Sequence, residues 1–194
     1  DTGTGIEHHV NIKNDYTLWG FGTGTSGQLG HGALTNKSSP VQIGSLTNWS
    51  SVALGASHTI AVKSDGTLWT WGANSFGKLG LGNTTDYSSP KQVGALTTWA
   101  VVGVGSHCSF AIKTDGTLWS WGRNEQGQLG HGNATYLSSP AQVGSLTDWA
   151  SINCSAATGA IKTDGTLWTW GGATNGGLGL GNSTSYNSPK QVGS

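Results

Sequence analysis

The chain has 194 residues, and its nine basic and nine acidic side chains give it a formal net charge of zero at pH 7. It therefore lacks the basic surface that contacts to phosphate require, which argues against nucleic-acid binding. No run reaches the ~20 apolar residues of a membrane span. Ten Trp residues and regularly recurring Gly distinguish the chain from a disordered Gly/Ser linker.

One sequence unit recurs about four times along the chain. Its period is marked by four aspartates, each just before a Thr-Leu-Trp or Tyr-Thr-Leu-Trp: Asp15, Asp65, Asp115 and Asp164. Self-similarity at such a period indicates a solenoid, a propeller or another array of repeats. Within a single repeat domain, residues 1–194, there is a partial unit at 1–16, full units at 17–66, 67–116 and 117–165, and a partial unit at 166–194.

The two partial units leave two arrangements open. Residues 1–16 match the last third of a unit, and residues 166–194 match its first part. The two ends of the chain would then complete one shared blade and close a ring, or the chain is a segment of a longer array. The absence of Met and the abrupt final Gln-Val-Gly-Ser favour the segment.

Each unit contains four short runs rich in Trp, Val, Ile and Thr, which are typical of strands. In the second unit, residues 67–116, the runs are Thr67–Gly72, Ser89–Gly94, Trp99–Val104 and Ser109–Lys113. No stretch keeps a period of 3.6, so helices are expected to be scarce. Four strands repeated at this period predict an all-β fold, a β-propeller of four-stranded blades.

The junction between the fourth run and the next Thr-Leu-Trp carries Asp-Gly, which predicts a two-residue hairpin turn. The aspartates are explained by hydrogen bonds within their own turns. The first unit has Asp15-Tyr16 instead. Because Tyr adopts a positive φ at a cost that Gly avoids, a different turn is expected there.

The tryptophans recur at fixed positions. Pairs at i and i+2, such as Trp69 and Trp71, project from one face of a strand. A second set, Trp49, Trp99 and Trp149, precedes the third run. Most of these rings are expected to pack between blades rather than to stack on a ligand.

These motifs resemble the repeats of the regulator of chromosome condensation family. The resemblance rests on the order LWxWGxNxxGQLGxGN, SSPxQV, GxxH[ST] and AIKxDG, and it extends along essentially the whole chain. It implies a propeller, with this chain forming about four blades of a seven-bladed ring. The compact repeats are most similar in style to those of bacterial and phage-borne members. At the GxxH position, His8 and His58, the resemblance implies a buried hydrogen bond within the blade.

The family's best-known activities match this chain poorly. Guanine-nucleotide exchange relies on a charged face, and only 9% of these residues are charged. The GWRHT motif of the plant UV-B photoreceptor is absent, and the sole Arg is Arg123. Inhibition of a target through aromatic loop residues, as in a β-lactamase inhibitor of similar fold, remains a third mode that the resemblance allows.

Residues that bear chemistry are better explained as scaffold. His8, His9, His58 and His107 lie near the fourth run, but their series continues with Cys108 and Ala157, which argues against a metal site. Cys108 and Cys154 fall at different positions of their units, so a disulfide is disfavoured and two free buried thiols are expected. No nucleophile elbow or phosphate-binding loop is present. We therefore predict a protein that is not an enzyme and has no metal or cofactor.

Recognition is expected where the repeats differ, in loops after the first run and before Ser-Ser-Pro. A row of loop aromatics there is typical of interfaces. The candidate binding residues are Phe76, Asp86, Tyr87, Arg123, Glu125, Tyr136, Leu137 and Tyr186.

The leading hypothesis is a non-catalytic binding or assembly module, extracellular or on a virion, as a structural or adhesion component. The alternatives are a soluble protein-interaction domain, acting as an inhibitor or exchange factor, and a glycan-binding lectin. The expected partners are proteins, including further copies or a larger assembly, with a glycan as a further candidate.

Overall fold

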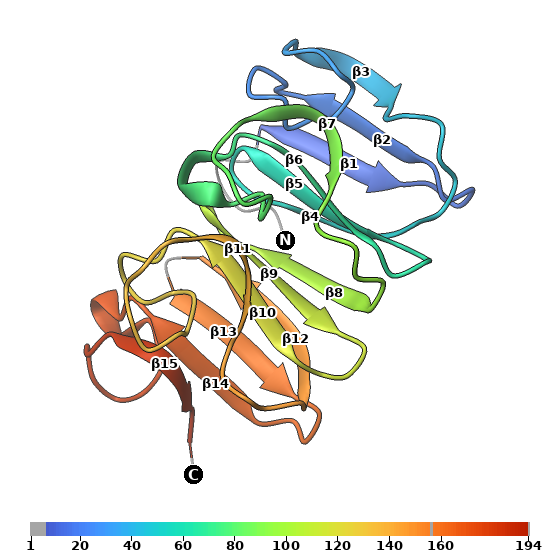
Figure 1. The fold of residues 1–194 in the computed structure, drawn as a ribbon. Coiled ribbons are helices and arrows are strands. Elements are labelled where there is room, and N and C mark those ends of the chain that lie inside the picture. Colours follow the sequence, from blue (N-terminus) through green and yellow to red (C-terminus); the bar gives the residue numbers. More distant parts are fainter. Residues whose placement is uncertain (1–6, 156, 194) are drawn as a thin grey trace.

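The computed structural model describes residues 7–155 and 157–193, which fold into four antiparallel sheets (Figure 1). The first sheet has three described strands, and the others have four. We call them blades 1 to 4. Blade 1 holds β1 (His8–Ile12), β2 (Leu18–Gly22) and β3 (Lys37–Gln42); blade 2 holds β4 (Trp49–Leu54), β5 (His58–Lys63), β6 (Leu68–Gly72) and β7 (Tyr87–Gln92). Blade 3 holds β8 (Trp99–Val104), β9 (Cys108–Lys113), β10 (Leu118–Gly122) and β11 (Leu137–Gln142); blade 4 holds β12 (Trp149–Cys154), β13 (Ala157–Lys162), β14 (Leu167–Gly171) and β15 (Tyr186–Gln191).

The all-β prediction is confirmed. In the described part of the chain, helix is limited to two 3₁₀ turns, η1 (Ser75–Gly77) and η2 (Thr174–Gly176), and no helix there is long and apolar enough to cross a membrane. The predicted strand at Ser89–Gly94 lies two residues earlier, as β7.

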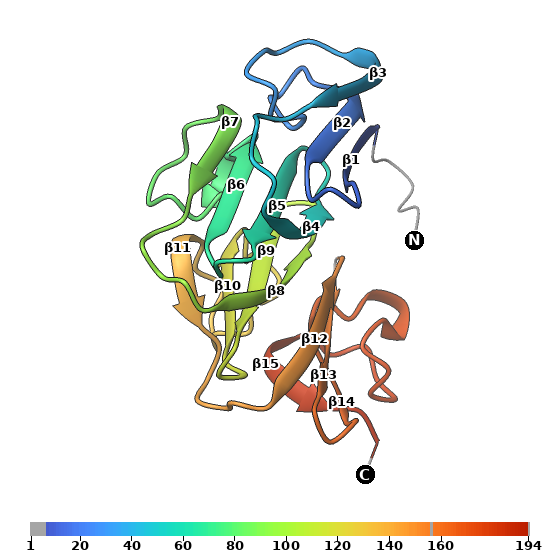
Figure 2. The same cartoon turned by 90° about the vertical axis from the view of Figure 1, so that its right-hand side faces the viewer.

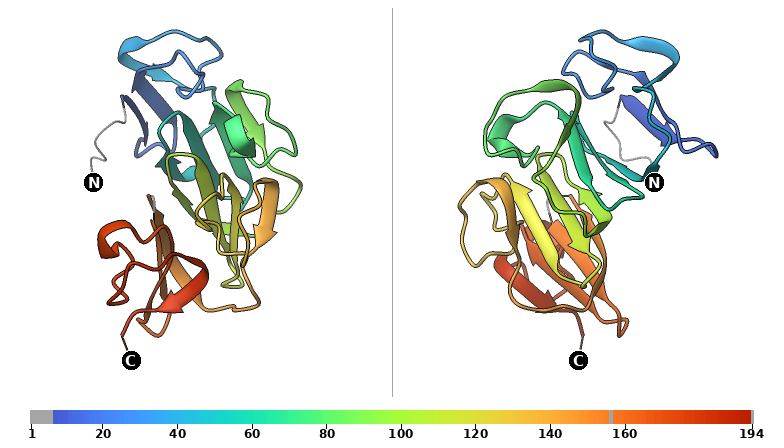
Figure 3. Two further views of the ribbon diagram at one scale, coloured as in Figure 1. Left: turned by 90° about the vertical axis from the view of Figure 1, so that its left-hand side faces the viewer. Right: turned by 45° about the vertical axis from the view of Figure 1, so that its right-hand side comes forward.

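The blades follow one another along an arc, with the N-terminal and C-terminal blades at its two ends (Figures 2 and 3). The first strands of blades 2, 3 and 4 lie next to one another on its inner side. Each of these blades takes its two inner strands from the end of one sequence unit and its two outer strands from the start of the next. A blade and a repeat unit are therefore out of phase, and every blade is tied to two units.

The ring closed by the two ends of the chain is not formed by the described residues, whose blades make an open arc. Among the described residues, β15 pairs with β14 alone, and no strand from 166–193 joins the sheet of β1, β2 and β3. The outer face of blade 4 is accordingly open: Ile161 and Leu167 are 44% and 43% exposed, whereas their equivalents Ile112 and Leu118 in blade 3 are 2% and 0% exposed.

The predicted role of the tryptophans between blades is confirmed. Trp71, Trp121 and Trp170 are fully buried, and each donates its indole N–H to a carbonyl of the preceding blade's loop. The ring of Trp121 fits because Gly80 has no side chain: a Cβ there would lie 2.7 Å from the indole nitrogen. The burial of these large rings supplies the apolar area that holds neighbouring blades together.

The motif Lys-x-Asp-Gly-Thr-Leu-Trp forms one local network in blade 2. The Asp65 carboxylate accepts hydrogen bonds from the Thr67 N–H at 3.0 Å and its hydroxyl at 2.6 Å, and Thr67 Oγ1 accepts one from Trp69 Nε1 at 2.8 Å. The Lys63 ammonium lies 3.7 Å from the Trp69 ring centroid. The other units repeat this network, which confirms the predicted hydrogen bonding of the aspartates within their turns.

Two expectations about these turns are wrong. The turn at Asp65-Gly66 has three loop residues, because Gly66 N–H donates to the Lys63 carbonyl and Gly66, with φ 76°, is the left-handed residue. Asp15-Tyr16 forms the same turn rather than a different one. Tyr16 N–H donates to the Lys13 carbonyl at 2.8 Å, and Tyr16 takes φ 62° despite its side chain.

Candidate functional site

Five side chains from two blades meet at the end of the sheets where the β6–β7 and β10–β11 loops emerge. We call them the loop cluster: Phe76, His107, Arg123, Glu125 and Tyr136. Phe76 comes from blade 2, and the other four come from blade 3. Four of the eight candidate binding residues are thus brought together.

Phe76 reaches blade 3 because its turn packs directly on β11. Gly77 allows this approach, since a Cβ there would lie 2.5 Å from the Ser138 Cα. Gly82 N–H donates to the Ser138 carbonyl at 2.8 Å and continues the contact. The loop of blade 2 therefore rests on its neighbour, and the Phe76 ring lies over the loop of blade 3.

The backbone at Phe76 is left-handed, with φ 65°, which is rare for a residue with a side chain. In units 1 and 3, a glutamine two residues later closes the turn: Gln28 and Gln128 each accept the N–H of the equivalent residue at 2.9 Å. Unit 2 has Lys78 there, and an ammonium cannot accept a hydrogen bond. The missing acceptor accounts for the different turn at Phe76.

The aromatic rings of the loop cluster meet edge to face. The Phe76 ring centroid lies 5.4 Å from that of Tyr136 and 5.6 Å from that of His107. The Arg123 guanidinium carbon lies 5.4 Å from the Phe76 centroid. Glu125 accepts hydrogen bonds from both Arg123 and the Tyr136 hydroxyl. This network fixes the orientation of an aromatic pair that stays accessible, with Tyr136 39% exposed.

The electrostatics of the loop cluster give one compensated ion pair at neutral pH. The hydrogen bond from Arg123, supported by that from Tyr136, lowers the pKa of Glu125. The bond to Glu125 raises the pKa of the Tyr136 hydroxyl. Burial, together with the charges of Lys78 and Arg123, lowers the pKa of His107. Glu125 is therefore an anion, Tyr136 is protonated, and His107 is neutral at pH 7.

A hollow of about 360 Å³ adjoins the loop cluster. Its lining is mostly polar: Ser106, His107, Cys108, Arg123, Glu125, Gln126, Gln128 and Ser155. Sequence reasoning did not select Ser106, Gln128 or Ser155. Gln128 was not selected because unit 1 has Gln28 at the same position, which is typical of a scaffold residue. Ser106 and Ser155 belong to no motif that indicates a site.

The sequence of this chain matches models of a known family of repeats. A family model for the regulator of chromosome condensation (RCC1) repeat matches residues 17–62, 65–112, 115–160 and 164–194, and a second RCC1 repeat model matches 49–78 and 100–128. The chain belongs to the RCC1 repeat family. No curated protein sequence matches it.

Solved RCC1-like propellers share the fold. The crystal structure of Prp20p from Saccharomyces cerevisiae, described with its binding to Gsp1p and histones, matches with a TM-score of 0.85 at 23% identity, covering 98% of this chain and 49% of that chain. Human WBSCR16 matches with a TM-score of 0.86 at 22% identity, covering 98% and 52%. Yeast RCC1 (Prp20) bound to Kap60 gives 0.86 at 22% identity, covering 98% and 47%. The chain thus spans about half the length of these structures.

The other four candidate residues lie outside the loop cluster of this RCC1-repeat arc. The Asp86 carboxylate accepts the Asn74 N–H at 2.6 Å and holds its loop closed, as Asn36 does in unit 1. Leu137 packs against buried hydrophobic clusters on both sides of blade 3. Tyr87 and Tyr186 lie on outer strands, each with a lysine ammonium about 5.5 Å from its ring centroid.

The histidines at the GxxH position of the RCC1 motif form contacts between blades. The expectation of a buried hydrogen bond within one blade is therefore wrong. His58 Nε2 lies 2.9 Å from Ser109 Oγ of blade 3, and His8 Nε2 lies 3.4 Å from Thr59 Oγ1 of blade 2. Within residues 7–155 and 157–193, no three His, Cys, Asp or Glu side chains are grouped as metal ligands. These histidines therefore connect the blades.

Lys78 is a buried cation at the centre of the blade 2–3 junction. Its ammonium donates to Ser57 Oγ at 2.8 Å, and burial lowers its pKa. The ion pairs in the described part of the chain are Arg123–Glu125 and Lys162–Asp148, so no carboxylate pairs with Lys78 there. A buried charge with one neutral partner is costly.

Proposed function

We propose that this RCC1-repeat chain is a non-catalytic protein-binding module whose loop cluster and adjoining hollow contact the partner. The observation that carries the proposal is the pair formed by half-buried Phe76 and exposed Tyr136, held across two blades by Arg123 and Glu125. Orientated aromatic rings beside an Arg are typical of interface hot spots. Positions that differ between repeats build this surface, and β-propellers of this family are suited to protein–protein interaction.

The chemistry of the site favours a folded protein surface as partner. The Glu125 carboxylate is already bonded to Arg123 and Tyr136, so it offers little to a highly basic tail. The hollow presents amide, hydroxyl and imidazole groups to a polar protrusion. Prp20p is described with binding to Gsp1p and histones. Of these two kinds of partner, the neutral loop cluster fits a folded protein such as Gsp1p better than a histone.

A photo-crosslinking amino acid in place of Tyr136 tests this function. The control carries the same amino acid at Leu46, which is 45% exposed in a loop at the opposite end of the sheets. Purified Gsp1p, purified histones and an extract of the source cells are offered to both. We expect one folded protein to be crosslinked from position 136, and Phe76→Ala to weaken its binding at least tenfold. Equal crosslinking from both positions would contradict the proposal.

For the setting of this binding we propose an extracellular or particle-borne assembly, as a structural or adhesion component. The support is compositional: charged residues are scarce, and Ser, Thr, Asn and Gly dominate the polar positions. Immunogold labelling with an antibody against the chain tests the proposal. Label on particles or in the extracellular fraction supports it, and label confined to the cell interior opposes it.

Two equivalent grooves favour glycan binding as a second candidate function. One, of about 390 Å³, is lined by Trp99, Trp119 and Leu96, and the next, of about 440 Å³, by Trp149 and Trp168 at the same repeat positions. Trp99 and Trp149 are buried, so the half-buried rings of Trp119 and Trp168 offer the surface for a sugar. Aromatic side chains are common in the lining of small-molecule sites. Saturable quenching of Trp fluorescence by one sugar, lost in Trp119→Ala, would support this function. Unchanged fluorescence across a sugar panel would eliminate it.

A further inference from the structure

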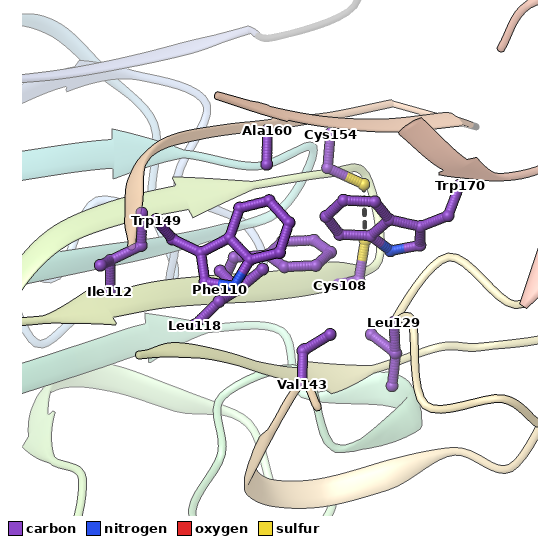
Figure 4. Packing of buried hydrophobic residues seen from close by; sticks show 10 residues of the cluster. All are labelled: Cys108, Phe110, Ile112, Leu118, Leu129, Val143, Trp149, Cys154, Ala160 and Trp170. Carbon is purple, nitrogen blue, oxygen red and sulfur yellow. Dashed lines mark hydrogen bonds between the residues drawn. The ribbon is translucent and has the colours of Figure 1, made fainter. Parts of the chain in front are cut away.

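The sulfur atoms of Cys108 and Cys154 lie 3.2 Å apart across the junction of blades 3 and 4. Figure 4 shows the two side chains pointing toward one another within the buried cluster that also contains Trp170 and Phe110. Both residues are free thiols and are 2% and 8% exposed. The prediction of free, buried cysteines is thus confirmed for burial, but the argument that their offset separates them is wrong, because the end of β12 packs against the start of β9.

This junction departs from the two others at linked positions. Cys108 stands where His8 and His58 form their inter-blade contacts. Cys154 ends β12 as Leu54 ends β4 and Val104 ends β8, and it pairs with Thr158 in the sheet. Gly55, the residue after Leu54, leaves space for the His58 ring, since an added Cβ there would lie 2.1 Å from it.

Blade 4 carries Ala157 at the position of His58 and Cys108, at the start of its second strand. Gly105 of blade 3 makes space, since a Cβ there would lie 2.7 Å from the Cys108 sulfur and 2.9 Å from the Cys154 sulfur. At this junction a contact between two thiols therefore takes the place of the contact that His58 makes with Ser109.

We propose that Cys108 and Cys154 form an inter-blade disulfide that covalently locks blade 4 to blade 3 under oxidising conditions. The oxidant is a low-molecular-weight disulfide such as oxidised glutathione. A thiolate of the pair attacks it and releases one thiol, giving a mixed disulfide; the second cysteine attacks the protein sulfur of that bond and releases a second thiol. The two protein thiols lose two protons and two electrons in total, and one small disulfide becomes two thiols.

The surroundings determine when this bond forms. The bond to Cys154 and burial raise the pKa of the Cys108 thiol, so it remains protonated at neutral pH in the folded chain. Cys154 is the more exposed thiol and also contacts Thr158 Oγ1 at 3.3 Å. Slow oxidation of the folded chain and faster oxidation during refolding are therefore expected, and the finished bond is shielded from reductants.

Peptide mapping of the complete chain tests the proposal. The protein is treated with oxidised glutathione, both folded and during refolding from denaturant, then alkylated and digested with trypsin without reduction. Cys108 lies in the peptide 92–113 and Cys154 in the peptide 124–162. We expect these two to be linked, about 2 Da lighter than their sum, and the midpoint of thermal unfolding to rise by several degrees.

The matched control restores the repeat at this junction with Cys108→His and Cys154→Val, the residues found at His58 and Val104. It retains a buried contact, because the introduced ring faces Thr158 as His58 faces Ser109, and its unfolding midpoint should not respond to the oxidant. Absence of the linked peptide in both treatments, lasting glutathione adducts, or links between two copies of one cysteine would overturn the proposal. None of these results depends on the loop cluster, so the binding function is judged separately.

Discussion

The rings of Phe76 and Tyr136 meet edge to face across the junction of blades 2 and 3, at an interplanar angle of 86°. Each ring is placed by a different device: Phe76 by a left-handed turn packed on Ser138, and Tyr136 by its hydrogen bond to Glu125. The pair thus has two roles: it stabilises the junction of blades 2 and 3, and it forms part of the surface proposed for binding.

A double-mutant cycle with Phe76→Ala and Tyr136→Ala measures this contact. Edge-to-face aromatic pairs contribute about 0.5–1.5 kcal/mol beyond their buried area, and we expect a coupling in that range in the free energy of unfolding by urea. Tyr136→Phe is the conservative control, because it keeps the ring contact and removes only the bond to Glu125. Strictly additive single effects would mean that the two rings do not interact in solution.

Lys78→Gln is expected to stabilise the chain. The change removes a buried cation and supplies the amide oxygen that closes the equivalent turns in units 1 and 3, so we expect a gain of about 1–2 kcal/mol in the free energy of unfolding. Urea denaturation measures it. The reverse change, Gln128→Lys, should destabilise blade 3, since the Gln126 N–H would lose its acceptor. A loss of stability in Lys78→Gln would show that the Ser57 contact outweighs the buried charge.

Tyr16→Gly is expected to raise the free energy of unfolding by about 1 kcal/mol, because glycine takes the left-handed backbone without the cost that a Cβ imposes. Tyr16 is 61% exposed, so little packing is lost. Thermal unfolding followed by circular dichroism measures the change. If Tyr16→Gly lowers the midpoint, the Tyr16 ring itself must contribute to packing.

A pair of glycine variants separates backbone strain from steric contact in the same turn. A Cβ at Gly116 would lie 2.1 Å from the Thr147 carbonyl oxygen, whereas nothing lies within 4 Å of one at Gly165. Both residues have positive φ, at 76° and 83°. Gly116→Ala should therefore destabilise the chain by more than Gly165→Ala in urea denaturation. Equal losses would mean that the loop carrying Thr147 moves aside.

The scaffold was predictable from sequence because every copy repeats the residues that build it. Trp121 needs Gly80, and Trp69 needs Thr67 and Asp65; these residues recur at fixed spacing, so the period reveals strands and packing together. The loop cluster was predictable only in part. Variation pointed to Phe76 and Tyr136, but their meeting depends on the packing of one blade's loop on the next.

Contacts between blades were the harder part to predict. Alignment compares equivalent positions, whereas a junction brings different positions into contact, such as Cys108 with Cys154 and His58 with Ser109. The offset between blades and repeat units could not be predicted for the same reason, because a blade begins in the middle of a repeat unit. The turn at Tyr16 shows that the hairpin of β1 and β2 keeps the three-residue turn of the repeat where the local residue disfavours the left-handed backbone.

The free energy of unfolding is expected to decrease as the pH falls below about 6.5, the pKa of a free histidine. Burial, with the charge of His9, lowers the pKa of His8 to about 4, and burial holds the pKa of His58 well below its usual 6.5. Between about pH 6.5 and 4 these histidines therefore bind protons in the unfolded chain but not in the folded chain. The free energy of unfolding decreases as the pH falls through this range, by up to about 1.4 kcal/mol per pH unit for each histidine.

Urea denaturation at a series of pH values between about 7 and 4.5 measures this slope. His58→Gln keeps a polar group near Ser109 and removes one titrating site, so its slope should be shallower than that of the original chain. His9→Gln should reduce the slope by less than His58→Gln does, because burial rather than the charge of His9 is the larger cause of the lowered pKa of His8. A slope that persists in His58→Gln and His8→Gln together would contradict this assignment and point to His107 and His131, whose pKa values burial also lowers.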